Sequence, residues 1–371
     1  MISVSEPLIG AREHEYVEEC LRTGWISSSG RFIDLFEERW AAYCGRRFGV
    51  AMANGTVALQ AAVAALRLQP GDEIIMPSFT IISCALAAVY NDCVPVLVDA
   101  EPRTGCMDVA AIEARITPRT RAIMPVHMYG HPVAMGAVLE LAARHKLAII
   151  EDAAEAHGAE LTMDGGATWR RCGSFGEMSC FSFYANKLVT TGEGGMVLTD
   201  DAALAERLRS QRNLAFQPQR RFLHDELGHN FRMTNLQAAV GVGQLERIDD
   251  IVARKRRQGA RYRERLAGVP GLRMLPEEPW ARSVFWMNGA VLQQSDARAF
   301  AGALAKRGVE TRPFFLGLHE QPALHRRGLC AGERHPVTEH LAAAGLYLPS
   351  GVGLTDAHLD DVVQAVRAEL C

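Results

Sequence analysis

Short, uninterrupted apolar runs alternate with helix-length apolar patterns over the first two-thirds of the chain. The runs fall at residues 71–77, 93–99, 121–126 and 147–152. Strands that face water on one side alternate apolar and polar residues, but these runs do not, so helices should cover both of their faces. The pattern therefore predicts an α/β fold with a mainly parallel central sheet. Ligands of such sheets bind beyond the carboxyl ends of the strands.

The character of the sequence changes near residue 234, where a long helical pattern with a basic face begins. It is followed by a strand candidate at 283–292, a helix at 297–308, a short strand at 309–314 and two terminal helical stretches. We predict a large domain over residues 1–249 and a smaller α+β domain over residues 250–371. Long loops are expected around 160–175 and 214–230, where they are candidates for active-site walls.

Charge and composition argue against several classes of protein. The 40 basic and 43 acidic side chains give a net charge of −3, which offers nucleic acid or an anionic membrane no electrostatic attraction. The uncharged stretches between Glu73 and Asp92 and between Arg121 and Glu140 contain proline and turn-forming residues, so we interpret them as strand and helix pairs rather than membrane spans. Nine cysteines without a CxxC pattern, and no visible secretory signal, favour the cytoplasm.

One lysine has surroundings unlike those of a typical surface lysine. Residues 173–200 read GSFGEMSCFSFYANKLVTTGEGGMVLTD and place Lys187 between an aromatic, hydroxyl-rich strand and a glycine-rich turn. If this segment is buried, desolvation lowers the pKa of the lysine and makes its amine available as a nucleophile. The alternative is an exposed loop lysine, which is the commoner situation for this residue type.

Two further segments carry groups that suit a pyridoxal cofactor. Asp152 ends the run LAIIED, where a carboxylate could pair with a protonated pyridine nitrogen, although it could equally cap the next helix. In ANGTVALQ, Gly55 and Thr56 begin a helix whose free N–H groups suit a phosphate. Each segment alone is a weak indication, and their combination with Lys187 is far more specific.

Together these motifs resemble the DegT/DnrJ-like sugar aminotransferases, a pyridoxal-phosphate-dependent family of the fold-type I aspartate aminotransferase superfamily. The resemblance runs over nearly the whole chain in the motifs ANGTVAL, PGDEIIMPSFT, PVLVDAEP, PVHMYGHP, EDAAEAHGA, CFSFYANKLVTTGEGGMV, HNFRMTNLQAAVGVGQLERI and ETRPFF. It implies a fold-type I large domain with a smaller C-terminal domain.

The resemblance also implies roles for single positions. Lys187 would bind pyridoxal 5'-phosphate as a Schiff base and then act as general acid and base. Asp152 would pair with the pyridine nitrogen of the cofactor. Gly55, Thr56 and Ser182 would hold its phosphate.

Four more positions follow from the resemblance. Asn230 would reach the phosphate from a second subunit, which makes the active form a homodimer with its site at the interface. His127 would line the cofactor floor, unless it is a buried structural histidine. Glu155 stands where many relatives have glutamine beside the phenolic oxygen, and Ile81 stands where many have an aromatic residue stacked on the ring. Plain apolar packing by Ile81 should weaken retention of the cofactor.

The implied reaction moves an amine from L-glutamate to a ketone on a nucleotide-linked sugar. The motifs NKLVTTGEGGMV, FRMTNLQAA and ETRPFF most resemble GDP-perosamine synthases, which aminate GDP-4-keto-6-deoxymannose; TDP- and UDP-linked ketosugars are the alternatives. The candidates for sugar and nucleotide contacts are Arg312, Phe314, Phe315 and His319. An arginine beside two aromatic rings suits a diphosphate and a base, but the same residues could form an apolar hinge.

Three competing interpretations remain. A pyridoxamine-dependent sugar dehydratase of the same fold would resemble this chain, but such enzymes carry histidine where this chain has Lys187. A regulatory protein that binds pyridoxal phosphate without turnover is a second alternative. A metal enzyme is disfavoured, because Pro132 interrupts any helix that would bring His127 and His131 onto one face.

Overall fold

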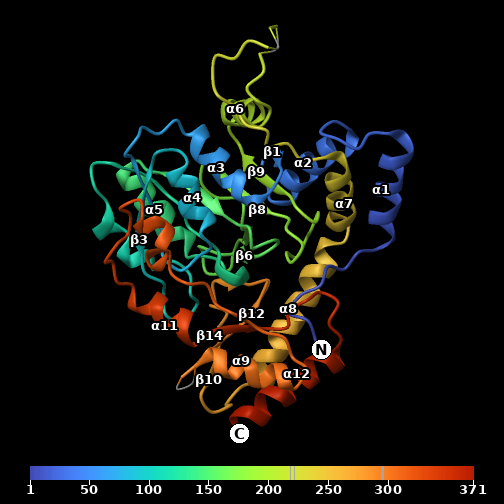
Figure 1. The fold of residues 1–371 in the computed structure, drawn as a ribbon, viewed down its shortest axis with the longest axis vertical. Coiled ribbons are helices and arrows are strands. Elements are labelled where there is room, and N and C mark those ends of the chain that lie inside the picture. Colours follow the sequence, from blue (N-terminus) through green and yellow to red (C-terminus); the bar gives the residue numbers. More distant parts are fainter. Residues whose placement is uncertain (218, 221, 294–295) are drawn as a thin grey trace.

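A seven-stranded sheet forms the centre of the computed structural model (Figure 1), which describes residues 1–217, 219–220, 222–293 and 296–371. From one edge to the other its strands are β1 (Phe48–Met52), β9 (Gly195–Thr199), β8 (Met178–Ser182), β5 (Ala148–Asp152), β4 (Thr120–Ile123), β2 (Glu73–Pro77) and β3 (Val94–Val98). Only β9 runs antiparallel to its neighbours β1 and β8, so the sheet is mainly parallel, as the sequence predicts.

Helices from the first two-thirds of the chain cover this sheet or, at one side, pack on the helices that do. They are α1 (Ala11–Thr23), α2 (Arg31–Tyr43), α3 (Gly55–Ala65), α4 (Ser83–Val89), α5 (Met135–His145), α6 (Ala202–Arg212) and α7 (Asn235–Leu245), with the short helices η1 (Val109–Ala111), η2 (Glu113–Arg115) and η3 (Met128–Gly130). Helices α3 and α6 pack against β1 and β9, and α5 packs against β4 and β5. The apolar strands are buried between these layers, which accounts for their lack of polar alternation.

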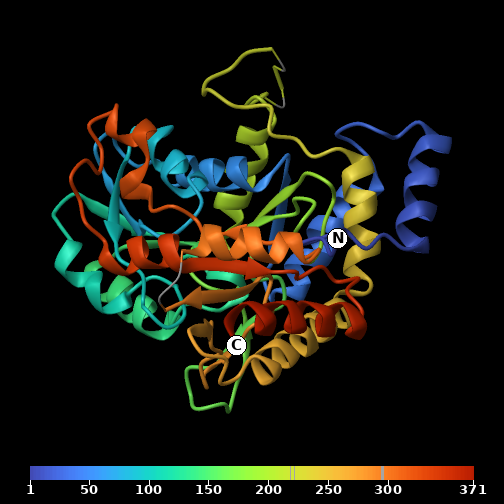
Figure 2. The same cartoon turned by 60° about the horizontal axis from the view of Figure 1, so that its bottom comes forward.

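The rest of the chain builds a smaller sheet with its own helices. Its elements are α8 (Ile248–Arg265), β10 (Leu272–Met274), β11 (Ala281–Arg282), β12 (Asn288–Leu292), α9 (Ala297–Lys306), β13 (Arg312–Pro313), η4 (Leu318–Glu320), α10 (Pro322–His325), α11 (Pro336–Ala344), β14 (Gly345–Leu348) and α12 (Asp356–Leu370). The four-stranded sheet has the order β10-β12-β14-β13. Its strands lie with α9 and α12 at the lower end of Figure 1, which Figure 2 brings forward. A separate apolar cluster in this part of the chain includes Tyr262, Leu304, Leu346 and Val362.

Three expected elements differ in detail from the structure. The helical pattern that begins near residue 234 forms two helices, α7 and α8, with a break at residues 246–247. The strand expected at 283–292 starts only at Asn288, because Phe285 has a positive φ of 45° that an extended strand does not allow. The strand expected at 309–314 is reduced to Arg312–Pro313.

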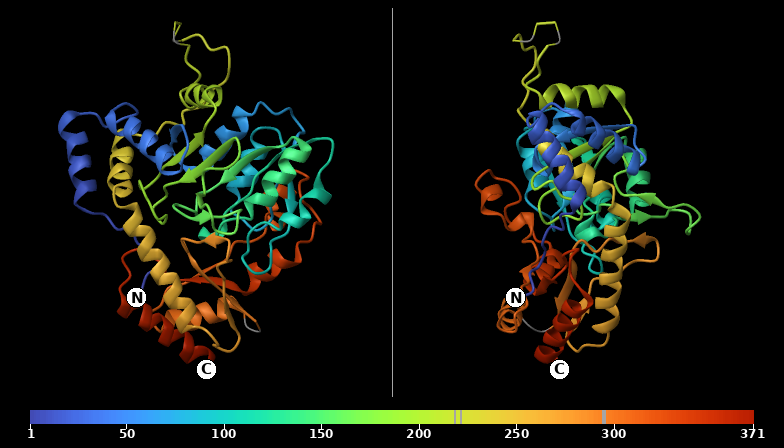
Figure 3. Two further views of the ribbon diagram at one scale, coloured as in Figure 1. Left: turned by 180° about the vertical axis from the view of Figure 1, so that it is seen from behind. Right: turned by 90° about the vertical axis from the view of Figure 1, so that its right-hand side faces the viewer.

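The two expected loops take different forms. Part of 160–175 forms the hairpin of β6 (Glu160–Leu161) and β7 (Arg170–Arg171), which joins β11 in a three-stranded sheet. The segment 214–230 connects α6 to α7, and its residues 218 and 221 lie outside the described part of the chain. Its described residues extend away from the body of the molecule, as does the tip of the hairpin (Figure 3).

Both uncharged stretches form the expected strand and helix pairs, β2 with α4 and β4 with α5. Within the described part of the chain, no helix combines the length and apolar character that crossing a bilayer requires.

Candidate functional site

Strand register brings three of the sequence motifs to one edge of the large sheet. Asp152 at the end of β5 lies opposite Cys180 in β8. Two residues further along β8, Ser182 lies opposite Gly195, which in turn lies opposite Met52 at the end of β1. The carboxylate of Asp152, the hydroxyl of Ser182 and the turn after Met52 are therefore neighbours at the carboxyl edge, where parallel sheets bind ligands.

The turn after β1 forms a cradle at the start of α3. The Asn54 side chain accepts a hydrogen bond from the Val57 N–H at 3.0 Å and so caps the helix. Gly55 is required by close approach, because a Cβ at this position would lie 2.6 Å from the Cβ of Ser182. The Thr56 hydroxyl lies 2.8 Å from the Ser83 hydroxyl. Hydroxyl groups and the positive end of a helix dipole thus surround one small space.

Asp152 lies at the bottom of this edge and is 2% exposed. Its two carboxylate oxygens accept hydrogen bonds from the Ala154 N–H at 3.0 Å and from the Cys84 thiol at 3.2 Å. Burial raises the pKa of Asp152, and these donors and the nearby charge of Lys187 oppose that rise. Residues 153–158 form turns rather than a helix, so Asp152 does not act as a helix cap.

Lys187 follows β8 by five residues and points into the protein. Its side chain is 10% exposed, so it is not the exposed loop lysine of the alternative interpretation. The Nζ atom lies 3.5 Å from Oε1 of Glu155 and 3.5 Å from the centre of the Trp286 ring. Burial lowers the pKa of Lys187, against the opposing effect of the carboxylates of Glu155 and Asp152. A lysine in this state offers an amine that loses its proton more readily than a surface lysine.

Glu155 connects Lys187 to the turn that contains Tyr129. Its Oε2 accepts a hydrogen bond from the Tyr129 N–H at 2.8 Å. Burial raises the pKa of Glu155 to about 7, and the Lys187 charge and the Tyr129 N–H counteract part of that rise. The acid can therefore be protonated near neutral pH, which is the condition under which it can donate a hydrogen bond as glutamine does.

This shifted pKa gives a test in the folded protein without any ligand. A raised pKa stabilises the folded state below the unfolded-state value, near 4.5, and that contribution is lost as the pH rises through about 7. The difference between a pKa of 4.5 and one of about 7 corresponds to about 3.4 kcal/mol at most. We therefore expect wild-type protein to lose stability relative to Glu155→Gln between pH 5 and pH 8, measured by urea unfolding.

The control for this measurement is Glu140→Gln, which changes an exposed carboxylate on α5. Its stability relative to wild type should stay constant within about 0.5 kcal/mol over the same range. Parallel pH curves for wild type and Glu155→Gln would show that Glu155 is not protonated in the folded protein near neutrality.

His127 is placed in the core, beneath the site. The Val133 N–H donates to its Nδ1 at 2.9 Å, so its Nε2–H donates to Oε1 of Glu151 at 2.8 Å. Glu151 also accepts from the N–H groups of Gly173 and Phe175, and Cys172 lies nearby. Both ring nitrogens of His127 are therefore used within the protein. These bonds favour the structural interpretation of this histidine over ligand contact through nitrogen.

The four residues expected at the substrate do not all face the same space. His319 is buried, with Nδ1 2.7 Å from the Ser78 hydroxyl and Nε2 3.3 Å from Glu339. Phe314 is also buried, with its ring centre 4.8 Å from that of Tyr129. These contacts join the smaller unit to β2 and η3, as an apolar hinge would.

Arg312, Phe315 and Ile81 are more accessible than these two residues. The Arg312 side chain is exposed, and Phe315 is half-buried with its ring centre 5.7 Å from that of Tyr129. Ile81 precedes α4 and is 43% exposed, so an apolar side chain is available beside the cradle. Asn230 is exposed as well, and its neighbour Phe231 accepts a backbone hydrogen bond from Ala53 at 2.8 Å.

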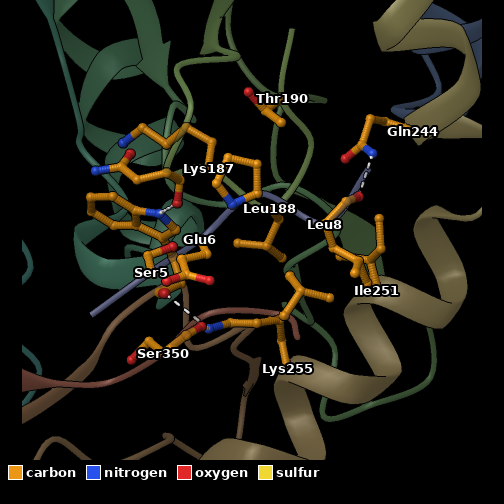
Figure 4. A pocket seen from close by; sticks show the side chains of 14 residues that line it. Ser5, Glu6, Leu8, Lys187, Leu188, Thr190, Gln244, Ile251, Lys255 and Ser350 are labelled. Carbon is orange, nitrogen blue, oxygen red and sulfur yellow. Dashed lines mark hydrogen bonds between the residues drawn. The ribbon is translucent and has the colours of Figure 1, made fainter. Parts of the chain in front are cut away.

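Sequence reasoning missed two residues of the site, Trp286 and Tyr129. Tyr129 has a positive φ of 52°, which is unusual for a bulky residue, and its buried hydroxyl has no hydrogen-bond partner in the described part of the chain. Such strain often marks functional sites. A small pocket lies behind Lys187, between the N-terminal segment and α8, and Figure 4 shows Leu188 and Lys255 on its wall.

The chemistry of these side chains fits pyridoxal phosphate. The group needs an amine for its aldehyde, an acid for its ring nitrogen and donors for its phosphate. Lys187 would provide the amine and Asp152 the acid. The hydroxyl of Ser182, with the start of α3 that Gly55 opens, would provide the donors. A side chain at position 55 would close this space, because its Cβ would lie 2.6 Å from the Cβ of Ser182.

Comparison with known proteins finds relatives that match almost the whole chain. A model of the DegT/DnrJ/EryC1/StrS aminotransferase family matches residues 7–367. The GDP-perosamine synthase of Caulobacter vibrioides is 43% identical over 369 residues, which cover 98% of this chain and 97% of the relative. That of Escherichia coli O157:H7 is 36% identical over 367 residues, which cover 99% of this chain and 98% of the relative.

A solved structure agrees with these sequence matches. DesV of S. venezuelae, determined in complex with a ketimine intermediate, superposes with a TM-score of 0.90 at 35% identity and covers 96% of this chain and 94% of its own. The matches span almost the whole sequence and confirm the resemblance that the motifs indicate. The chain belongs to the DegT/DnrJ/EryC1/StrS aminotransferase family.

Proposed function

We propose that the protein uses pyridoxal phosphate, bound covalently by Lys187, to move an amine from L-glutamate to a nucleotide-linked ketosugar. The observation that carries this proposal is the meeting of Lys187, Asp152 and the cradle at Gly55 and Ser182 at one sheet edge. A lysine with a lowered pKa and a buried acid at that edge are the two groups that amine transfer requires.

When bound, the cofactor supplies an aldehyde that reacts with amines and a ring that stabilises negative charge on the reacting carbon. The carboxylate of Asp152 would hold a proton on the ring nitrogen, and the hydroxyl of Ser182 and the start of α3 would hold the phosphate. As a free amine, Lys187 would stay tethered to the chain beside the reacting carbon. It can then take a proton from one carbon and return it to another.

Glu155 is suited to support both tasks of Lys187. As a neutral acid it can donate to an oxygen of the bound group, and as a carboxylate it stabilises the ammonium form of Lys187 at 3.5 Å. The pKa of Glu155 at about 7 makes both forms accessible near neutrality. Restoring the proton to Lys187 therefore does not require bulk water to reach the buried amine.

For the sugar we propose GDP-4-keto-6-deoxymannose, with GDP-perosamine as product. The identity to two GDP-perosamine synthases over nearly the full length supports this substrate. Arg312 and Phe315 are accessible and suit a diphosphate and a base. Because Phe314 and His319 pack inside the hinge, we assign them to holding this loop rather than to contacting the nucleotide.

A visible absorbance spectrum tests both halves of the reaction. Purified protein with pyridoxal phosphate should turn yellow, lose the colour with L-glutamate and regain it when GDP-4-keto-6-deoxymannose is added. Bleaching without recovery would exclude this sugar and leave TDP- and UDP-linked ketosugars to be tested. Failure to develop colour would contradict the cofactor assignment itself.

We further propose a homodimer in which Asn230 contacts the cofactor phosphate of the partner. The exposed apolar side chains Ile81, Tyr184 and Leu316 support a covered surface near the site. Asn230→Ala should weaken binding of pyridoxal phosphate roughly tenfold, as expected for one hydrogen bond to a charged group. Fluorescence titration measures this, with Asn213→Ala as the matched control.

Mixed dimers decide whether the site is shared. A dimer of one Lys187→Ala chain and one Asn230→Ala chain has one intact site if Asn230 acts across the interface. Its activity should then approach half that of wild type. If Asn230 acts within its own chain, beside Ala53, the mixed dimer should show no more activity than Asn230→Ala alone.

Two further expectations remain proposals. The nine free cysteines support a cytoplasmic location, where thiols stay reduced. The apolar cluster around Tyr262 supports a boundary between two domains near residues 249 and 250.

A further inference from the structure

The side chain of Trp286 contacts the Lys187 segment at two points. The Nζ of Lys187 lies 3.5 Å from the centre of the indole ring. The indole N–H donates a hydrogen bond of 2.7 Å to the carbonyl oxygen of Asn186, the residue just before the lysine. One side chain thus contacts both the amine and the backbone of the lysine segment, although the two residues lie far apart in the sequence.

The backbone of Trp286 is itself held firmly. Its carbonyl accepts a hydrogen bond of 3.0 Å from the Nζ of Lys255, a buried lysine in α8 that also donates to the carbonyl of Ser350. Figure 4 shows Lys255 reaching across the pocket floor to Ser350, with Lys187 on the opposite side. Phe285, with its φ of 45°, forces the turn that presents the tryptophan.

We propose that Trp286 is a positioning residue for Lys187: its indole face holds the ammonium and its N–H fixes the backbone of Asn186. The ring carries negative charge density on its face and attracts a cation most strongly where water is excluded. Trp286 is 4% exposed and Lys187 is nearly buried, so the attraction acts in such a place. The importance of Lys187 in this inference rests on the proposed function.

Trp286 acts on the Lys187 ammonium together with the charged groups around it. Glu155 at 3.5 Å and the more distant Asp152 favour the ammonium form, while burial opposes it. Burial also lowers the pKa of the nearby His157 to about 3, so this imidazole adds no charge. The ring face adds a second contact to the ammonium, and the indole N–H holds the carbonyl of the residue just before it. Trp286 therefore keeps the free amine aimed at one place between the two chemical tasks of Lys187.

Competitive acylation of the cofactor-free protein tests this role without any turnover. The chain has four lysines, and Lys146 and Lys306 are exposed references within the same sample. Labelling of the Lys187 peptide from pH 6 to 11, read by mass spectrometry, gives the pKa of that amine. We compare Trp286→Phe, which keeps an aromatic face, with Trp286→Leu, which does not. Both side chains are smaller than tryptophan and leave cavities of similar size, so the aromatic face is the main difference between the two variants.

We expect the pKa of Lys187 to be lower in Trp286→Leu than in Trp286→Phe by about half a unit to one and a half units. A purely structural role for Trp286 would change the melting temperature of both variants but not this difference. If the leucine variant does not fold, a fluorinated tryptophan at position 286 can replace it. Fluorination keeps the shape of the side chain but weakens the attraction of the ring face for a cation, so the pKa of Lys187 should again be lowered. Equal pKa values in all these proteins would overturn the proposal.

Covalent binding of pyridoxal phosphate by wild-type protein is recorded separately. Should it fail while the leucine and phenylalanine variants still differ, the proposed function is wrong and the role of Trp286 stands. Should it succeed while the variants agree, the proposed function stands and Trp286 only fills space.

Discussion

Replacing Lys187 with alanine should abolish covalent attachment of pyridoxal phosphate and lower turnover by at least about four orders of magnitude. The variant loses the amine that binds the aldehyde and, with it, the group that moves the proton. Alanine leaves a small space beside Trp286 and removes a buried amine, so the fold should survive. Borohydride reduction followed by peptide mass spectrometry measures the attachment, and thermal melting confirms the fold.

The structure supplies a demanding control for this assignment. Lys255 is also buried, and burial lowers its pKa to about 7, so it is the other amine in the chain with raised reactivity. Its Nζ donates to two carbonyls and lies away from the cradle at Gly55. We expect the adduct to vanish in Lys187→Ala rather than move to Lys255, and to persist in Lys306→Ala. An adduct mapped to Lys255 in wild-type protein would refute the assignment.

The parts of the site that follow the ends of strands could be predicted from the sequence. Asp152 ends an apolar run, and Ser182 and Lys187 end or follow another, so a parallel sheet must bring them to one edge. Gly55 begins a helix after a strand, and the same rule places it there. Local sequence suffices at these positions because strand pairing, rather than side-chain packing, sets their location.

Residues placed by packing between distant segments could not be predicted in this way. Trp286 lies in a stretch whose apolar letters indicate a strand, and only the turn at Phe285 carries its ring to Lys187. His319 follows the motif ETRPFF and was expected at the substrate, but its hydrogen bond to Ser78 draws it into the hinge. The environment of these side chains depends on contacts between residues 100 positions apart for Asn186 and Trp286 and 241 positions apart for Ser78 and His319, which no local pattern records.

Asp152→Asn should slow the reaction with L-glutamate roughly a hundredfold to ten-thousandfold while leaving covalent attachment in place. Asparagine keeps the shape and can still accept from the Ala154 N–H, but it cannot hold a proton on the ring nitrogen by charge. The ring then withdraws electrons less strongly, and the proton leaves carbon more slowly. Single-turnover absorbance with saturating L-glutamate measures this rate.

The matched control is Asp201→Asn. Asp201 also follows a strand, β9, but it caps α6 by accepting from the N–H groups of Ala203 and Leu204. Its replacement should cost about 1 kcal/mol of stability at most and leave the rate unchanged. Burial raises the pKa of Asp152, and a positive charge on the ring nitrogen would oppose that rise by pairing with the carboxylate. An unchanged rate in Asp152→Asn would mean that this pairing does not occur and that another acid, with Glu155 the first to examine, holds the ring proton.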